Sequence, residues 1–167
     1  MSATVYDSPV GSLRLEARDG SLVSLELNAR PGPEHLDDPV LAAAVAQLRA
    51  YFAGERTSFD LPLALHGNPF EQRVWAALQE IPYGETASYG EIAERIGAPG
   101  AARAVGLANG RNPVAIIVPC HRVIGAGGKL VGFGGGLPMK RALLDLEQGV
   151  AGLLAPGDHP GRPASLA

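Results

Sequence analysis

Apolar and polar residues alternate along two short stretches near the start of the chain, residues 12–17 and residues 22–27. A two-residue period places successive side chains on opposite faces, as in a half-buried antiparallel strand. Residues 4–6 form a third strand-like run, and turn-forming sequences at residues 8–11 and 18–21 separate the three. The pattern therefore predicts a small antiparallel sheet.

The next periodic segment has the spacing of a helix. Apolar residues recur at intervals of three and four positions, at Leu41, Val45, Leu48 and Phe52. Gly54 ends this pattern, as glycine often does after a helix. We expect the helix to cover the sheet, which makes residues 1–66 a small α/β N-terminal domain. No residue in this part indicates chemistry.

A linker at residues 61–67 leads into a second part, residues 67–150, which we predict to be a mainly α C-terminal domain. Asn68 and Pro69 have the residue types preferred at the N-cap and first turn of its first helix. The remaining residues, 151–167, are rich in glycine and proline and are expected to form a flexible tail.

Two helices joined by a glycine-containing turn indicate a helix-turn-helix, a layout shared with winged-helix domains. Ser88 and Glu91 have the spacing of a capping box that begins the first helix. The second, expected over residues 101–108, is nearly all small residues, and Arg103 is its one charged residue. Such a helix is either buried and tightly packed, or it approaches the minor groove of DNA with Arg103 inserted.

Composition limits the class of protein. Of the 167 residues, 46% are apolar and 19% charged, as in ordinary globular proteins. No apolar run reaches the roughly 18 residues of a membrane span, and the first residues lack the features of a secretory signal. The single cysteine, Cys120, excludes an internal disulfide. We therefore expect a cytoplasmic protein with no membrane partner.

The net charge of −3 argues at first against a nucleic-acid partner. The charge is unevenly distributed, however. Residues 1–66 hold nine acidic and five basic residues, whereas residues 100–148 hold two acidic and six basic ones. An acidic first part beside a basic second part points to a polyanionic partner.

The surroundings of Cys120 favour a reactive thiol, although a lone cysteine is most often a small buried apolar residue. Pro119 fixes the backbone before it, and the basic pair His121 and Arg122 follows it. Positive charge nearby would increase the thiolate fraction. A proton relay from the thiol to His121 requires a local turn, because consecutive side chains point apart in regular structure.

Several motifs in the second part resemble those of the O6-alkylguanine-DNA alkyltransferase family. They follow the family's order over residues 69–148 and comprise YGETASY (83–89), AARAVG (101–106), GRNPV (110–114), IVPCHRVIG (117–125) and GGGL (134–137). The first 66 residues match more loosely.

The resemblance implies that Cys120 accepts the alkyl group from O6 of a damaged guanine in double-stranded DNA. His121 would take the thiol proton through a water, and Glu147, which on its own reads as a solvated surface residue, would hold the imidazole. Asn112 would brace the active-site loop against the recognition helix. Because the thioether product is stable, each chain would act once, without a methyl-donor cofactor.

The resemblance also implies minor-groove binding and rotation of the damaged nucleotide out of the duplex. Tyr89 would bind the base and Arg103 would fill the vacated stack. Further DNA contacts are implied for Ala101, Ala102 and Gly106, and a substrate pocket for Tyr89, Val123, Phe133, Gly134 and Gly135. A monomer is expected, with cooperative binding along DNA left open.

Two pocket positions depart from the family pattern. Members often have Tyr in place of Phe133, and some have Ser in place of Gly134. We therefore expect a roomier pocket that accepts larger alkyl groups or an O4-alkylthymine. Zinc-binding members use cysteines and histidines of the first domain, and residues 1–66 contain no cysteine. No metal is therefore expected.

Other functions compete with repair. Relatives that sense alkylated DNA without transfer lack the cysteine, so Cys120 argues against that function. A cysteine hydrolase would use Cys120 and His121 for acyl transfer, but it would need an oxyanion hole and gives no role to the small-residue helix. A winged-helix transcription factor would carry a polar recognition helix.

Overall fold

The computed structural model describes residues 1–149, so the expected tail at residues 151–167 lies outside the described part. In the first part, strands β1 (Ser2–Ser8), β2 (Gly11–Arg18) and β3 (Ser21–Glu26) form an antiparallel sheet in the order β1-β2-β3. Strands β1 and β2 alternate buried and more exposed side chains, and the pairing of all three strands confirms the predicted sheet.

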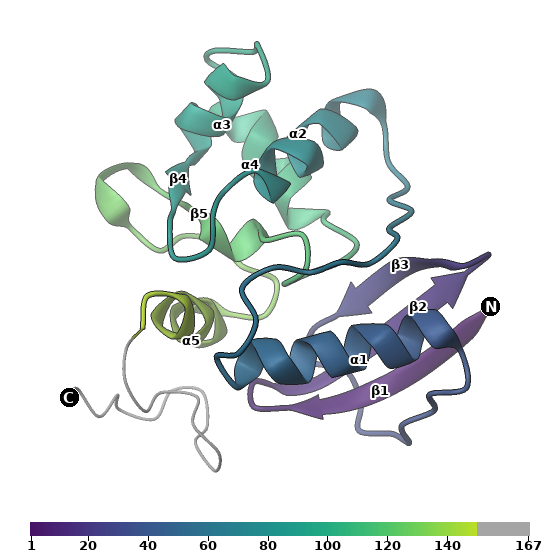
Figure 1. Ribbon diagram of the computed structural model, residues 1–167. Helices are drawn as coiled ribbons and strands as arrows, with labels where there is room; N and C mark the ends of the chain where they lie inside the picture. The colour runs from purple at the N-terminus through teal and green to yellow at the C-terminus, as the bar shows by residue number, and fades with distance from the viewer. Residues whose placement is uncertain (150–167) are drawn as a thin grey trace.

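Helix α1 (Pro39–Phe52) lies across this sheet, as predicted from its apolar spacing (Figure 1). The carboxylate of Asp38 caps its start by accepting hydrogen bonds from the backbone N–H groups of Val40 and Leu41. The buried face of α1 includes Leu41, Val45, Leu48, Tyr51 and Phe52. These side chains fill the space between helix and sheet.

The second part is mainly helical, as expected. Its helices are α2 (Pro69–Gln79), α3 (Tyr89–Arg95), α4 (Ala102–Gly110) and α5 (Leu137–Glu147). Both predicted capping residues, Asn68 and Ser88, form complete capping boxes. Helix α4 ends two residues later than the sequence predicted.

One small sheet was not foreseen. Strands β4 (Ala87–Ser88) and β5 (Val123–Ile124) pair in parallel, and they connect the start of α3 to the segment after Cys120. Two short 3-10 turns, η1 (Cys120–Arg122) and η2 (Ala126–Gly128), flank β5. Strands this short carry no readable periodicity, since a two-residue pattern has no second repeat.

The two parts share one continuous core. Strand β3 forms backbone hydrogen bonds with the second part: Leu25 N–H donates to Pro113 at 2.9 Å, and Ala115 N–H donates to Leu25 at 3.3 Å. The linker is held similarly, because Leu22 N–H donates to Pro62 at 2.8 Å. The first part therefore supports the segment that leads to Cys120. Among residues 1–149, no helix is long and apolar enough to cross a membrane.

The Asn68 cap gives a direct test of this part of the fold. Asn68→Ala removes the acceptor for Glu71 N–H, so we expect a loss of about 1 kcal/mol in the free energy of unfolding, measured by urea denaturation. Asn68→Gly, the matched control, should cost only a few tenths of a kcal/mol, because glycine is tolerated at N-caps. Equal losses in the two variants would contradict a capping role.

Candidate active site around Cys120

The backbone before Cys120 folds back on itself and is fully buried. Residues 114–118 form tight internal hydrogen bonds, from Val118 N–H to Val114 (3.0 Å) and from Ile117 N–H to Ala115 (2.8 Å). Within this segment Ile116 has a φ of 71°, an unfavourable value for a β-branched residue. The surrounding hydrogen bonds hold this strained backbone, which delivers Cys120 into the turn η1.

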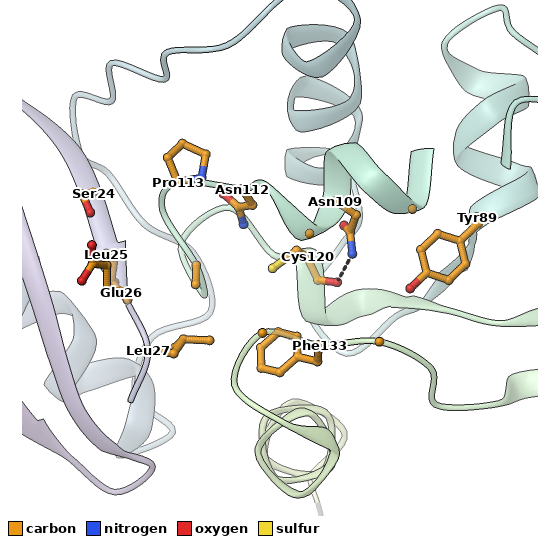
Figure 2. Close-up of a pocket in the computed structure, with 15 residues that line it drawn as sticks. Ser24, Leu25, Glu26, Leu27, Tyr89, Asn109, Asn112, Pro113, Cys120 and Phe133 are labelled. Carbon is orange, nitrogen blue, oxygen red and sulfur yellow. Dashed lines mark hydrogen bonds between the residues drawn. The ribbon is translucent and has the colours of Figure 1, made fainter. Parts of the chain in front are cut away.

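Cys120 lies on the wall of a cavity of about 710 Å³ (Figure 2). The lining comes from both parts of the chain: residues 24–27 of β3 and the stretch after it, residues from the end of α4, and residues 132–134. Figure 2 shows Tyr89 and β3 at opposite ends of this cavity, with Cys120 between them. The thiol is thus largely buried, yet it faces a space that is large enough for a small molecule.

His121, the residue after Cys120, is held by the carboxylate of Glu147, as the resemblance implied. His121 is fully buried, and its Nε2 lies 2.7 Å from Oε2 of Glu147. Its Nδ1 is also buried and has no hydrogen-bond partner among the described residues. Glu147 is buried as well, so it is not the surface carboxylate that its place near the end of α5 would favour.

Two further side chains bind the same carboxylate. Arg122 donates from Nε to Oε1 of Glu147 at 2.7 Å and from Nη2 to Oε2 at 3.0 Å. The Tyr51 hydroxyl donates to Oε2 at 2.6 Å. Burial alone would raise the pKa of Glu147, but the hydrogen bonds from His121 and Arg122, together with the charge of Arg122, lower it to about 2. The carboxylate is therefore ionised at neutral pH.

This charge fixes the tautomer of His121. Burial lowers the pKa of the imidazole, so it is neutral at pH 7 despite its bond to Glu147. An ionised carboxylate only accepts hydrogen bonds, so Nε2 carries the proton. The free lone pair then lies on Nδ1, which is the unpaired atom. His121 is thus a neutral base with one buried site for a proton.

The thiol itself is protonated at rest. Burial raises the pKa of Cys120, and the side chain of Asn112 and the charge of Lys140 offset this only in part. Our expectation of an increased thiolate fraction from the basic pair is wrong, because Arg122 points to Glu147 and burial outweighs the remaining charge. A base is therefore required to activate the sulfur.

Asn112 links the end of α4 to the strained segment. Its Nδ2 donates to the carbonyl of Val118 at 2.7 Å, and its Oδ1 accepts from Val114 N–H at 3.0 Å. Asn109, which the sequence did not single out, donates to the Cys120 carbonyl at 3.3 Å. Both amides thus hold the backbone around the thiol.

Most of the remaining predicted residues lie near the cavity. Tyr89, Gly106, Phe133 and Gly134 line it, whereas Val123 is fully buried in β5 and, like Gly135, does not line it. Helix α4 buries only Val105, Ala108 and Asn109, so it is not the fully enclosed helix that we considered. Arg103 lies on its exposed face.

Sequence reasoning missed two polar residues of the site, Tyr51 and Lys140, and gave Arg122 the wrong role. Tyr51 lies on α1 at a position that periodicity assigns to the core, whereas Arg122, expected to increase the thiolate fraction of Cys120, binds Glu147 instead. Lys140 is fully buried and donates to the carbonyls of Val123 (2.6 Å) and Val131 (3.0 Å), which orders the glycine-rich loop. No local signal identifies these residues, since each acts on a partner far along the chain. Within residues 1–149, no group of three His, Cys, Asp or Glu side chains could hold a metal.

Two family models match almost all of the described chain. Residues 1–65 match the ribonuclease-like domain of 6-O-methylguanine DNA methyltransferase, and residues 69–149 match its DNA binding domain. The chain is 61% identical over 147 residues to a methylated-DNA–protein-cysteine methyltransferase of Mycobacterium tuberculosis, covering 85% of this chain and 89% of the relative. A protein of the same name from Methanosarcina acetivorans is 50% identical over 155 residues, covering 88% and 98%.

A solved structure has a similar fold. The Mycobacterium tuberculosis OGT in complex with DNA superposes with a TM-score of 0.81 at 58% identity, covering 93% of this chain and 96% of that one. Both structures therefore share one fold. It consists of a three-stranded sheet with a helix, followed by a mainly helical second part.

The buried carboxylate predicts how stability depends on pH. Because the pKa of Glu147 falls from roughly 4.3 in the unfolded chain to about 2 in the folded one, the group stabilises the fold above pH 4.5. This contribution, about 3 kcal/mol, is lost as the pH falls from 4.5 to 2. In Glu147→Gln the free energy of unfolding should therefore fall less steeply over this range, as measured by urea denaturation at each pH.

Glu94→Gln provides the control, because Glu94 is exposed on α3. It should keep the wild-type dependence on pH. If Glu147→Gln and wild type give parallel curves between pH 5 and 2, the carboxylate is not held as described.

Proposed function

Because the chain belongs to the 6-O-methylguanine DNA methyltransferase family, we propose that it repairs alkylated double-stranded DNA by moving the alkyl group from O6 of guanine to Cys120. One structural observation supports the proposal in addition to family membership. A buried thiol that faces a cavity is followed, in the same turn, by a neutral imidazole whose Nδ1 is unpaired. This pairing supplies a nucleophile together with its base.

The transfer begins with the thiol proton, which passes through a water to Nδ1 of His121. Glu147 then stabilises the imidazolium, because its ionised carboxylate already binds Nε2 at 2.7 Å. The thiolate attacks the alkyl carbon, the S–C bond forms, and the bond from carbon to O6 breaks. The guanine anion takes up a proton from water and remains in the DNA as unmodified guanine, while the imidazolium of His121 returns its proton to water.

The product explains why each chain acts once. A thioether has no leaving group that water displaces under mild conditions, and the sequence contains no second cysteine to exchange with it. The alkylated base is itself the donor, so the reaction needs no small-molecule cofactor. The protein is consumed with its substrate.

Helix α4 is the surface that we assign to DNA. Ala102 and Gly106 give it little side-chain bulk, and Gly106 packs near the ring of Tyr89, so the backbone can approach a narrow groove. Arg103 projects from its exposed face. A base rotated out of the duplex would enter the cavity beside Tyr89, and Arg103 would occupy the vacated stack. We propose that the chain binds DNA as a monomer.

Mass spectrometry tests the transfer and separates it from the competing functions. After mixing with a duplex that contains O6-methylguanine, the wild-type chain should gain the mass of one methyl group on Cys120. Cys120→Ser should bind the same duplex but gain nothing, since the hydroxyl is a far weaker nucleophile at neutral pH. An unmodified wild-type chain that still binds the duplex would identify a sensor instead.

The cavity predicts tolerance of large adducts. Phe133 lacks a hydroxyl, and a Cβ added at Gly134 would meet no atom within 4 Å, so neither residue crowds this wall of the cavity that Cys120 also lines. We expect the single-turnover rate for O6-benzylguanine duplex to lie within about tenfold of the rate for O6-methylguanine duplex. Gly134→Leu should slow the benzyl reaction selectively. A strict preference for methyl in the wild-type chain would contradict a roomy pocket.

A further inference from the structure

Tyr51 connects the first part of the chain to the proton-accepting residue of the second. It lies in the last turn of α1, is fully buried, and donates its hydroxyl hydrogen to Oε2 of Glu147 at 2.6 Å. His121 binds the same oxygen through Nε2 at 2.7 Å. The hydroxyl and the imidazole therefore meet at one carboxylate oxygen, although 96 residues separate Tyr51 from Glu147.

The ring of Tyr51 is fixed on several sides. It packs edge-on against Phe52, with ring centroids 5.1 Å apart, and against Tyr83 at 6.2 Å. Phe59 lies at 5.4 Å, tilted by 41°. These contacts leave the ring no other place in the core, so the hydroxyl is held in position before any substrate binds.

The hydroxyl is a donor at every working pH. Burial raises the pKa of Tyr51 well above its ordinary value of 10.0, and the charge of Glu147 raises it further. A mere packing role would be served by phenylalanine, whose ring fills the same space. A buried hydroxyl at hydrogen-bond distance from an ionised carboxylate thus indicates a polar role.

We propose that Tyr51 is a positioning residue for the alkyl transfer proposed above: its hydroxyl fixes the carboxylate of Glu147 and limits how tightly that carboxylate binds the protonated form of His121. The proposal rests on the proposed function, in which His121 is the base. The first part of the chain thereby has a role in the reaction, through the hydrogen bond from Tyr51 to Glu147 that joins the two parts.

The Tyr51 hydroxyl influences the pKa of His121 because both side chains bind the same oxygen of Glu147. Donors that bind one oxygen reduce its negative charge toward one another, so loss of the Tyr51 hydroxyl strengthens the bond from Glu147 to the imidazolium. The pKa of His121 then rises. Burial, Arg122 and Lys140 all act to lower it and remain in place, while Glu147 alone raises it.

The two other titratable groups nearby, the Cys120 thiol and the Tyr83 phenol, do not oppose this rise in the pKa of His121. The Cys120 thiol is neutral at rest, because burial raises its pKa. The Tyr83 phenol also stays neutral, because burial raises its pKa too. His121 is a base only above its own pKa, so a raised pKa removes activity at low pH and spares it at high pH.

The test compares Tyr51→Phe with Tyr83→Phe. Each variant loses one hydroxyl from the same aromatic cluster, but the Tyr83 hydroxyl reaches the Leu146 carbonyl, at 3.5 Å, rather than the carboxylate. In Tyr51→Phe the acid limb of the rate of methyl transfer should move up by about half to one pH unit, the equivalent of one ordinary hydrogen bond. On the acid limb, at pH values below the wild-type pKa of His121, the rate should fall about three- to tenfold, with the plateau at high pH nearly unchanged. Tyr83→Phe should keep the wild-type profile.

A double-mutant cycle shows whether Tyr51 acts through Glu147. In a Glu147→Gln background, Tyr51→Phe should cause no further shift of the acid limb, because its partner charge is already gone. An equal shift in both backgrounds would overturn the proposal. So would a Tyr51→Phe variant that loses only thermal stability and keeps the wild-type profile.

Nitrogen-15 NMR of His121 in the free protein tests the proposal without DNA, and therefore separates its failure from failure of the proposed function. The proton should reside on Nε2 in the wild-type chain, and the pKa of His121 should be higher in Tyr51→Phe. If that variant does not fold, the wild-type spectrum decides. A protected Tyr51 hydroxyl proton close to the Nε2 proton of His121 supports the contact, and its absence overturns it.

Discussion

The ionised carboxylate of Glu147, buried at the junction of the two parts, is the charge on which the site depends. An unpaired buried charge costs several kcal/mol, so the fold is stable only if donors surround it. Arg122 and His121 come from the turn after Cys120, and Tyr51 comes from α1, which lies beside the end of α5 (Figure 1). Satisfying one carboxylate therefore requires that the sheet domain, the cysteine turn and the last helix assemble together.

The carboxylate of Glu147 also helps to give two neighbouring side chains different roles, His121 as the base and Cys120 as the nucleophile. Because burial, helped by the charge of Arg122, keeps the pKa of His121 low, Glu147 orients the imidazole without forcing a proton onto it, and the imidazole remains a neutral base. Burial meanwhile keeps the Cys120 thiol protonated. The sulfur is thus a weaker nucleophile than a thiolate until its proton moves to Nδ1. A reagent that acts once gains from such protection, because any wasted reaction also consumes the protein.

Local features of the sequence predicted local structure well. The three strands of the N-terminal sheet, α1 and the caps at Asn68 and Ser88 were foreseen, because each depends on residues a few positions apart. The family motifs located the cysteine turn and the imidazole–carboxylate pair. Tyr51 could not be foreseen, since an apolar helix face does not distinguish a packing tyrosine from one that donates a hydrogen bond. The inward burial of Val123 was likewise hidden, because a two-residue strand has no pattern to read.

The first part of the chain is therefore more than a support. Its β3 strand holds the backbone at Pro113 and Ala115 and also lines the cavity. The strained φ of Ile116 persists between that strand and the turn of Cys120, so the sulfur position depends on contacts that the second part alone does not provide. A separated second part would keep the cysteine, the imidazole and the carboxylate in its sequence. It would nevertheless lose the donor from α1 and the strand that fixes the loop. With them it would lose the geometry that lets the thiol accept an alkyl group from the substrate.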